Sequence, residues 1–291
     1  MYGSLEEIVR IAQEDGKPLW EVVLEEDCKE SALSREDSLA RMGAMWQAMK
    51  DSDAEYDPEL RSASGMVGTD AAKLAARKEA GQLLSGGFVS SVSVRALKIA
   101  ESNACMKRIV ASPTAGSCGV VPACLITAQE KLGLSDQKMV EALYVSAGIG
   151  GVIAIRASLS GAEGGCQAEI GSASAMAAGA LAYLQGGSPD EVCHAAALAL
   201  KGLLGLVCDP VAGLVEVPCV KRNVIGSVNA VTSADMAMAG IRSKIPADQV
   251  FDAMRSIGRT MPSDLRETGK GGLAATPAGV QMASCCGSCM A

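Results

Sequence analysis

The segment from 172 to 184 constrains the fold more than any other, because almost all of its side chains are small. It reads Ser-Ala-Ser-Ala-Met-Ala-Ala-Gly-Ala-Leu-Ala-Tyr-Leu. Alanine favours helix, and a helix with so little side-chain volume excludes water only where neighbouring backbones approach it closely. Across the chain 49% of residues are hydrophobic but only 3% are aromatic, so the same demand applies to the whole interior. The sequence therefore predicts tightly packed helices.

Helix start signals recur along the chain, whereas strand signals are scarce. Ser4 and Glu7 match a capping box, and Ser188-Pro-Asp-Glu191 combines an N-cap, a first-turn proline and an acidic third residue. Roughly ten helices and two or three short extended segments are expected, without alternation of strands and helices. The predicted fold class is mainly α: a compact multi-helix domain with a few short extended segments.

The domain organisation follows from composition along the 291 residues. We expect one domain over 1–280, with a polar, turn-rich linker or exposed excursion at 51–68. Residues 281–291, which hold Cys285, Cys286 and Cys289, are expected to form a flexible cysteine-rich tail.

Charge and hydropathy limit the partners. The net charge of −7 argues against nucleic acid and anionic membranes, which both require a basic face, and favours a small-molecule substrate. The apolar stretches 142–160 and 192–208 are interrupted by Arg156 and Lys201, which is typical of buried helices rather than membrane spans. The first residues carry no basic region before an apolar run, so the predicted location is cytoplasmic.

Three of the eleven cysteines lie in segments marked by glycine or proline. Cys166 follows Gly164-Gly165, while Cys208 and Cys219 bound a segment with two prolines. Glycine permits close backbone approach and proline holds non-helical geometry, so each thiolate stands where it can reach a metal. Three sulfur ligands without a neighbouring histidine favour an iron–sulfur cluster over a hard cation. The alternative is that the three are buried small hydrophobic residues, the role assigned to Cys28, Cys105, Cys118, Cys124 and Cys193.

A loop of small residues, 112–119, precedes a predicted helix at 120–132. Backbone N–H groups and hydroxyls at a helix start attract an anion, although the same residue types also make ordinary connections.

Five blocks together resemble the alpha chain of the iron–sulfur-dependent, pyridoxal-independent L-serine dehydratases. They follow the family's order from about residue 60 onward. The blocks are Ser64-Gly-Met-Val-Gly-Thr-Asp70, Ser112-Pro-Thr-Ala-Gly-Ser-Cys-Gly-Val-Val-Pro122, Glu163-Gly-Gly-Cys-Gln-Ala-Glu-Ile-Gly-Ser172, Cys208-Asp-Pro-Val-Ala-Gly-Leu-Val-Glu-Val-Pro-Cys-Val-Lys-Arg-Asn223 and Gly269-Lys-Gly-Gly-Leu273.

The resemblance implies a four-iron, four-sulfur cluster held by Cys166, Cys208 and Cys219, with one iron left open for the substrate. An open iron is a Lewis acid for the hydroxyl of L-serine while a base removes the α-proton, and pyruvate and ammonia result. The resemblance also points to donors for the substrate carboxylate. These are Ser112, Thr114, Gly116 and Asn103, with Lys270 as a further candidate that is equally well explained as a solvated loop lysine.

No catalytic base is assigned within the chain. Single-chain members of the family carry a Ser-Ser-His-Thr motif in an N-terminal domain that this sequence lacks, so a separate beta chain is expected to bring the histidine. His194, the only histidine here, lies in an apolar helical pattern and is expected to be structural. Glu163 and Glu169 flank Cys166 and either tune the cluster or stabilise the helix start.

Three alternatives stay open. A relative that removes sulfide from L-cysteine would use the same cluster, and a closed four-ligand metal site would make the cysteines purely structural. A pyridoxal enzyme would need a Schiff-base lysine, for which Lys107, Lys201, Lys221 and Lys270 lack a recognisable setting. In single-chain relatives the terminal cysteine reaches back to the cluster, but here Met290 and Ala291 follow Cys289, so that role does not transfer.

Overall fold

The computed structural model describes residues 2–287, with side chains as far as residue 285. Within this part thirteen α-helices are joined by loops and short turns, and no β-strand occurs. The α-helices are α1 (Leu5–Asp15), α2 (Leu19–Ser31), α3 (Arg35–Ala54), α4 (Asp70–Glu79), α5 (Gly87–Ala104), α6 (Val120–Leu132), α7 (Asp136–Arg156), α8 (Gly161–Gly164), α9 (Ser172–Leu184), α10 (Pro189–Lys201), α11 (Cys219–Met238), α12 (Ala247–Thr260) and α13 (Pro277–Gly287). The short turns are η1 (Ala115–Ser117), η2 (Gln167–Gly171, a π turn), η3 (Val211–Gly213), η4 (Ser263–Leu265) and η5 (Gly272–Ala275).

The mainly α class predicted from the sequence is confirmed. The expected extended segments are reduced to two isolated β-bridges, one joining Arg61 to Gly68 and one joining Cys208 to Arg266.

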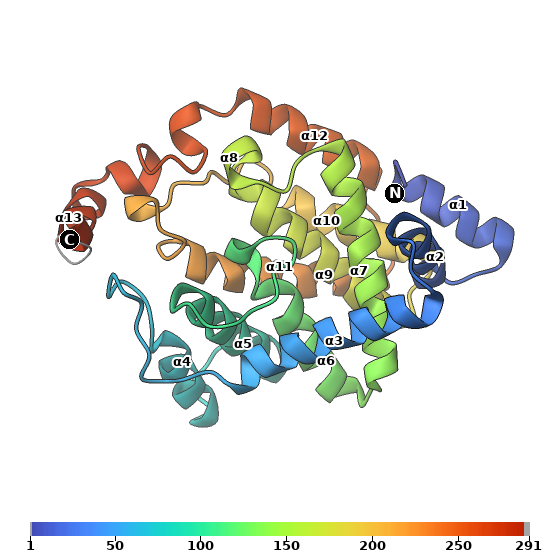
Figure 1. Cartoon of the computed structure of the whole chain (residues 1–291), viewed down its shortest axis with the longest axis horizontal. Helices are drawn as coiled ribbons and strands as arrows, with labels where there is room; N and C mark the ends of the chain where they lie inside the picture. The colour runs from blue at the N-terminus through green and yellow to red at the C-terminus, as the bar shows by residue number, and fades with distance from the viewer. Residues whose placement is uncertain (1, 288–291) are drawn as a thin grey trace.

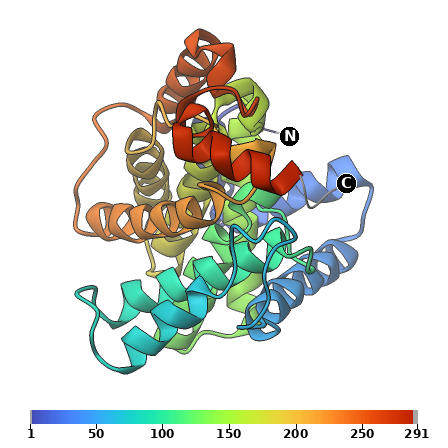
Figure 2. The same ribbon diagram turned by 90° about the vertical axis from the view of Figure 1, so that its left-hand side faces the viewer.

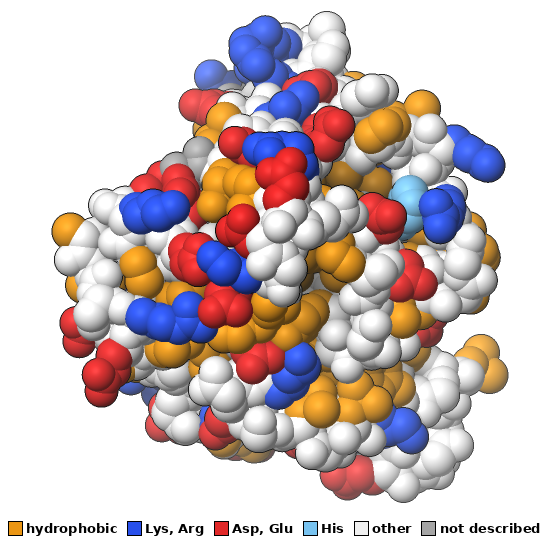
Figure 3. Space-filling model, turned by 90° about the vertical axis from the view of Figure 1, so that its right-hand side faces the viewer, with side chains coloured by type: hydrophobic (Ala, Val, Ile, Leu, Met, Phe, Trp, Pro, Cys, Tyr) orange, Lys and Arg blue, Asp and Glu red, His pale blue; other side chains and the backbone are white. Residues whose placement is uncertain are grey.

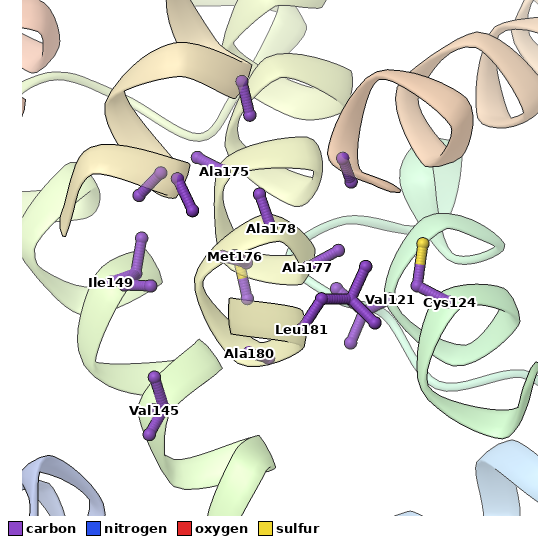
Figure 4. Close-up of a cluster of buried hydrophobic side chains, with 14 of the residues drawn as sticks. Val121, Cys124, Val145, Ile149, Ala175, Met176, Ala177, Ala178, Ala180 and Leu181 are labelled. Atoms are coloured by element: carbon purple, nitrogen blue, oxygen red, sulfur yellow. The ribbon is translucent and has the colours of Figure 1, made fainter. Parts of the chain in front are cut away.

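Helix α9 is the centre of the molecule and is surrounded by α6, α7, α10 and α11 (Figure 1). All of its residues except Tyr183 are buried. Figure 4 shows its alanines between Val145 and Ile149 of α7 on one side and Val121 and Cys124 of α6 on the other. The run of small side chains is thus the axis around which the other helices pack.

The closeness of this packing is visible at two glycines. A Cβ added at Gly179 of α9 would stand 2.2 Å from Ile149 Cδ1. A Cβ added at Gly226 of α11 would stand 2.8 Å from Ile170 Cγ2. Both helix contacts therefore depend on the absence of a side chain, because interiors leave no spare volume at such distances.

The helix start signals act as the sequence predicts. Ser4 Oγ accepts a hydrogen bond from Glu7 N, and Ser188 with Glu191 forms a full capping box at the start of α10. These local contacts satisfy N–H groups that the first turn of a helix leaves without partners.

The first and last helices, α1 and α13, lie at opposite ends of the long axis (Figure 1). Helices α1–α3 form the N-terminal end, whereas α13 lies at the front of the opposite face in Figure 2. There α13 packs against η3 and η5. By length and composition α7 is apolar enough to cross a bilayer, but 61% of its most apolar window is buried in the fold, as in a core helix.

Two segments differ from the sequence-based expectation. The predicted linker at 51–68 begins inside α3, where buried Asp53 pairs with Arg95 at 3.1 Å, and it continues as a loop whose Ser62 donates to Glu216 at 2.8 Å. Residues 281–287 of the predicted flexible tail belong to α13. Proline at its first position and the Thr276 Oγ1 bond from Gly279 N (3.1 Å) favour that helix start. The domain boundaries themselves stay a prediction.

Candidate functional site

The three cysteines singled out in the sequence are held by three different elements. Cys166 directly precedes η2, the π turn that leads into α9, and Cys219 is the first residue of α11. Cys208 is fixed through its backbone, since its N–H donates to Leu265 O and its carbonyl accepts from Glu267 N, both at 2.8 Å. All three are free thiols, with exposures of only 2%, 3% and 7%.

The three thiols are neighbours that affect one another's ionisation. Burial raises the pKa of Cys166 to about 11 and that of Cys219 to about 12, the latter with help from Cys166. Burial also raises the pKa of the Cys208 thiol, and the neighbouring Cys166 and Cys219 both add to the rise. A position at the start of a helix favours a thiolate, but at Cys166 desolvation outweighs that effect.

The side-chain arrangement does not form a single-ion site. Among the described residues no group of three or more His, Cys, Asp or Glu side chains could hold one metal ion. A cubane cluster is a different demand, because each cysteine thiolate then binds a different iron. Three buried, reduced and mutually coupled thiols fit that donor set in number and chemistry.

Arg222 links the cysteine segments from the first turn of α11. Its guanidinium donates to Val207 O and to Asp209 Oδ1, both at 2.8 Å, and so holds the two residues that flank Cys208. Its charge also opposes the burial-driven rise in the pKa of Cys166. Asp209 in turn accepts from Leu273 N at 2.8 Å, which connects this network to η5.

Glu169 joins the cysteines to the loop at 112–119. Its Oε1 accepts from Thr114 Oγ1 at 2.8 Å, and its Oε2 lies 3.9 Å from the Cys208 thiol, which donates to it. Burial raises the pKa of Glu169 above its ordinary value. Gly161 packs closely against both side chains, since a Cβ there would stand 2.8 Å from Glu169 Oε2 and 2.9 Å from Cys208 Sγ.

The loop at 112–119 contains three of the predicted substrate donors, Ser112, Thr114 and Gly116, and Asn103 of α5 contacts it. Thr114 is engaged by Glu169, and Asn103 donates to Ala115 O at 3.1 Å. The carbonyl of Gly116 accepts from Asn223 Nδ2 at 2.8 Å. Ser112 is 7% exposed, and its hydroxyl has no hydrogen-bond partner among the described residues. A buried hydroxyl without a partner is costly, so Ser112 is the donor most available to a ligand.

Two further residues considered in the sequence analysis, Lys270 and His194, lie outside this network of contacts. Lys270 is exposed in a loop whose Gly269 packs on Gly213 and Pro210. His194 is half-buried. Figure 3 shows the histidine side chain, in pale blue, at the surface on the side of the molecule where the N-terminal helices lie. It lines a groove between α1, α10 and α12 that includes none of the three cysteines.

The remaining candidates are Glu163 and the cysteines near the end of the chain. Glu163 is exposed and accepts from Ser158 Oγ at 2.7 Å, so of the two flanking acids only Glu169 contacts a cysteine. Cys285 is exposed on α13. The side chain of Cys286 and all of Cys289 lie outside the described residues.

Sequence reasoning did not single out Arg222, Asp209 or Asn223. All three lie in the block from 208 to 223, where Asp209 stands among apolar residues and Arg222 and Asn223 follow Lys221 in a short polar run. Only Asp209 therefore carries a local signal, since a polar residue in an apolar stretch requires a partner when it is buried.

Fold and site together define a helical protein with a buried three-thiol centre at the ends of its central helices. The chain belongs to the serine dehydratase alpha chain family, whose sequence model matches residues 14–274. It is 45% identical to "Probable L-serine dehydratase, alpha chain" of Bacillus subtilis (strain 168), over 97% of this chain and 94% of the relative. It is 40% identical to "L-serine dehydratase, alpha chain" of Peptoniphilus asaccharolyticus, over 96% of each chain. "L-serine dehydratase" of Streptomyces coelicolor is 37% identical over 92% of this chain but only 60% of its own length.

Proposed function

We propose that this chain is the alpha chain of an L-serine dehydratase, a lyase that converts L-serine to pyruvate and ammonia with a four-iron, four-sulfur cluster and a separate beta chain. The observation that carries the proposal is membership of the serine dehydratase alpha chain family over nearly the whole chain, with three buried thiols gathered at one site. The names of the relatives favour L-serine over L-cysteine as substrate.

Cys166, Cys208 and Cys219 would hold the cluster. When bound, it would supply an open iron as Lewis acid for the leaving hydroxyl. Elimination of water from serine would give an enamine, and its imine tautomer would then take up water and break down to pyruvate and ammonia, so that no water is gained or lost overall.

The chain's own residues would bind and orient the substrate. Ser112 supplies an uncommitted hydroxyl, and the backbone around Gly116 supplies N–H donors for the carboxylate. Thr114 and Asn103 shape that loop through their bonds to Glu169 and Ala115. Lys270 would add a positive charge from the loop in which the neighbouring Gly269 packs against Pro210.

The base would come from the beta chain. The one histidine of this chain lies in a groove without the cysteines, and the Streptomyces relative is longer than the region matched here. Both observations support a second polypeptide that completes the site. The nine free cysteines among the described residues suit a reducing compartment, and we propose the cytoplasm.

The test is anaerobic reconstitution of the chain with iron, sulfide and the beta chain, followed by iron counting, visible spectroscopy and pyruvate release. Alanine at Cys166, Cys208 or Cys219 should lower both iron content and pyruvate release, whereas Cys193→Ala should change neither. Parallel assays with L-cysteine, read as sulfide release, separate the desulfidase alternative. Full turnover by this chain alone, or by any of the three variants, would refute the proposal.

A further inference from the structure

A basic pocket lies between α8, α12 and the segment after η4, and none of the residues proposed to bind serine lines it. Its volume is about 310 Å³, within the size range of small-ligand sites. Helices α8 and α12 lie side by side here (Figure 1), and they touch so closely that a Cβ at Gly258 would stand 2.9 Å from Gly164 Cα. Both glycines of this contact line the pocket.

Three arginines line this pocket: Arg255, Arg259 and Arg266. Arg255 and Arg259 are four positions apart and therefore lie on the same face of α12. Arg266 comes from the segment after η4 and reaches the same hollow. The only carboxylate in the lining is Glu163, so the pocket carries a net charge of +2.

None of the three guanidinium groups has an ion-pair partner among the described residues. The other arginines that approach a carboxylate within 4.0 Å do so at ordinary distances, for example Arg156 with Asp252 at 2.6 Å. Glu163 is engaged by Ser158 at 2.7 Å. The Nε atom of Arg266 is buried and has no hydrogen-bond acceptor within the described part of the chain.

Three like charges around one hollow repel one another, and a buried guanidinium N–H without an acceptor is costly. A ligand with two negative charges and several acceptor oxygens would remove both costs. Guanidinium groups match phosphate and carboxylate oxygens in geometry, so these are the ligand groups that the lining would recognise.

We propose that Arg255, Arg259 and Arg266 form a binding site for a compact dianion, either a phosphate group or a small dicarboxylate. Arg266 forms a β-bridge with Cys208, and Gly164 and Ala168 of the lining flank Cys166. The occupied pocket would therefore adjoin two of the segments that carry the candidate cluster thiols.

The experiment is isothermal titration of the reduced full-length chain with inorganic phosphate and, separately, with succinate, at constant ionic strength. We expect saturable binding of at least one of them. Arg259→Gln and Arg255→Gln should each weaken it about tenfold or more, because each variant loses a charge-assisted bond to the anion. Arg41→Gln, at an exposed arginine on α3, is the matched control and should bind like the parent chain.

The two probes distinguish the ligand classes: preference for phosphate indicates a phosphorylated ligand, and preference for succinate indicates a dicarboxylate. Either preference supports the site, provided that the pocket variants weaken it and circular dichroism shows that they are folded. Absence of saturable binding for both probes, or equal weakening by Arg41→Gln, would overturn the proposal. Because titration needs neither cluster nor beta chain, its outcome is independent of the dehydratase assay.

Discussion

Replacing Arg222 with glutamine should lower the free energy of unfolding more than replacing any arginine on the surface. The guanidinium is 14% exposed and the paired Asp209 side chain 4% exposed, so the ion pair is largely removed from water. Removing one partner of a buried pair costs about 3–5 kcal/mol, because the other charge is left without compensation. Asp209 keeps the bond from Leu273 N at 2.8 Å, so we expect about 3 kcal/mol, the low end of that range.

The measurement is urea unfolding of the reduced, cluster-free chain followed by far-UV circular dichroism. Arg222→Gln, Asp209→Asn and the double variant form a cycle in which the double variant should lose less than the sum of the single losses, by about 2 kcal/mol. Arg41→Gln, far from this network, should lose less than about 0.5 kcal/mol. A loss below about 1 kcal/mol for Arg222→Gln, or simple additivity in the cycle, would show that the pair does not hold the segment together.

Three further perturbations test the fold. Hydrogen bonds from Gln129, Lys50 and Trp46 lower the pKa of Asp136 to about 2. The Asp136 carboxylate therefore stabilises the folded chain above about pH 4, and this contribution is lost as the pH falls through about 2. Because that side chain is 60% exposed, Asp136→Asn should cost only about 1 kcal/mol at pH 7 in urea unfolding, and the difference should vanish near pH 2. Gly179→Val places atoms where Ile149 already lies and should lower stability by about 2–3 kcal/mol; an unchanged urea midpoint would contradict the close packing of α7 and α9. Ser188→Ala removes the cap of α10 and should cost about 1 kcal/mol, measured in the same way; a neutral result would mean that the capping box does not contribute.

Features that depend on neighbours in sequence could be predicted from the chain alone. The boundary signals at Ser4 and Ser188 are local hydrogen-bond patterns, and both helices begin where those patterns place them. The buried, small-sided α9 also followed from composition, because no other environment suits such a segment. The tail was harder: 281–287 is helical in the structure, since residues before it, Thr276 and Pro277, provide the start.

The candidate site was only partly predictable, because its contacts join distant segments. The glycine and proline context marked Cys166, Cys208 and Cys219, but nothing local indicates that Glu169 lies between Thr114 and Cys208. Likewise Arg222 reaches back across more than a dozen residues to Val207 and Asp209. Such partners are chosen by the packing of whole helices, which one sequence does not specify.

The packing of α9 and the gathering of the thiols have a common physical origin. Cys166 precedes the π turn that leads into α9, and Cys219 begins α11, so the distance between these two helices sets how close the two sulfur atoms come. Gly226 lets α11 approach to the point where an added Cβ would stand 2.8 Å from Ile170. A larger residue there would push the helices apart and move Cys219 away from Cys166. The small side chains of the core are therefore a condition for the three-thiol site as well as for the fold.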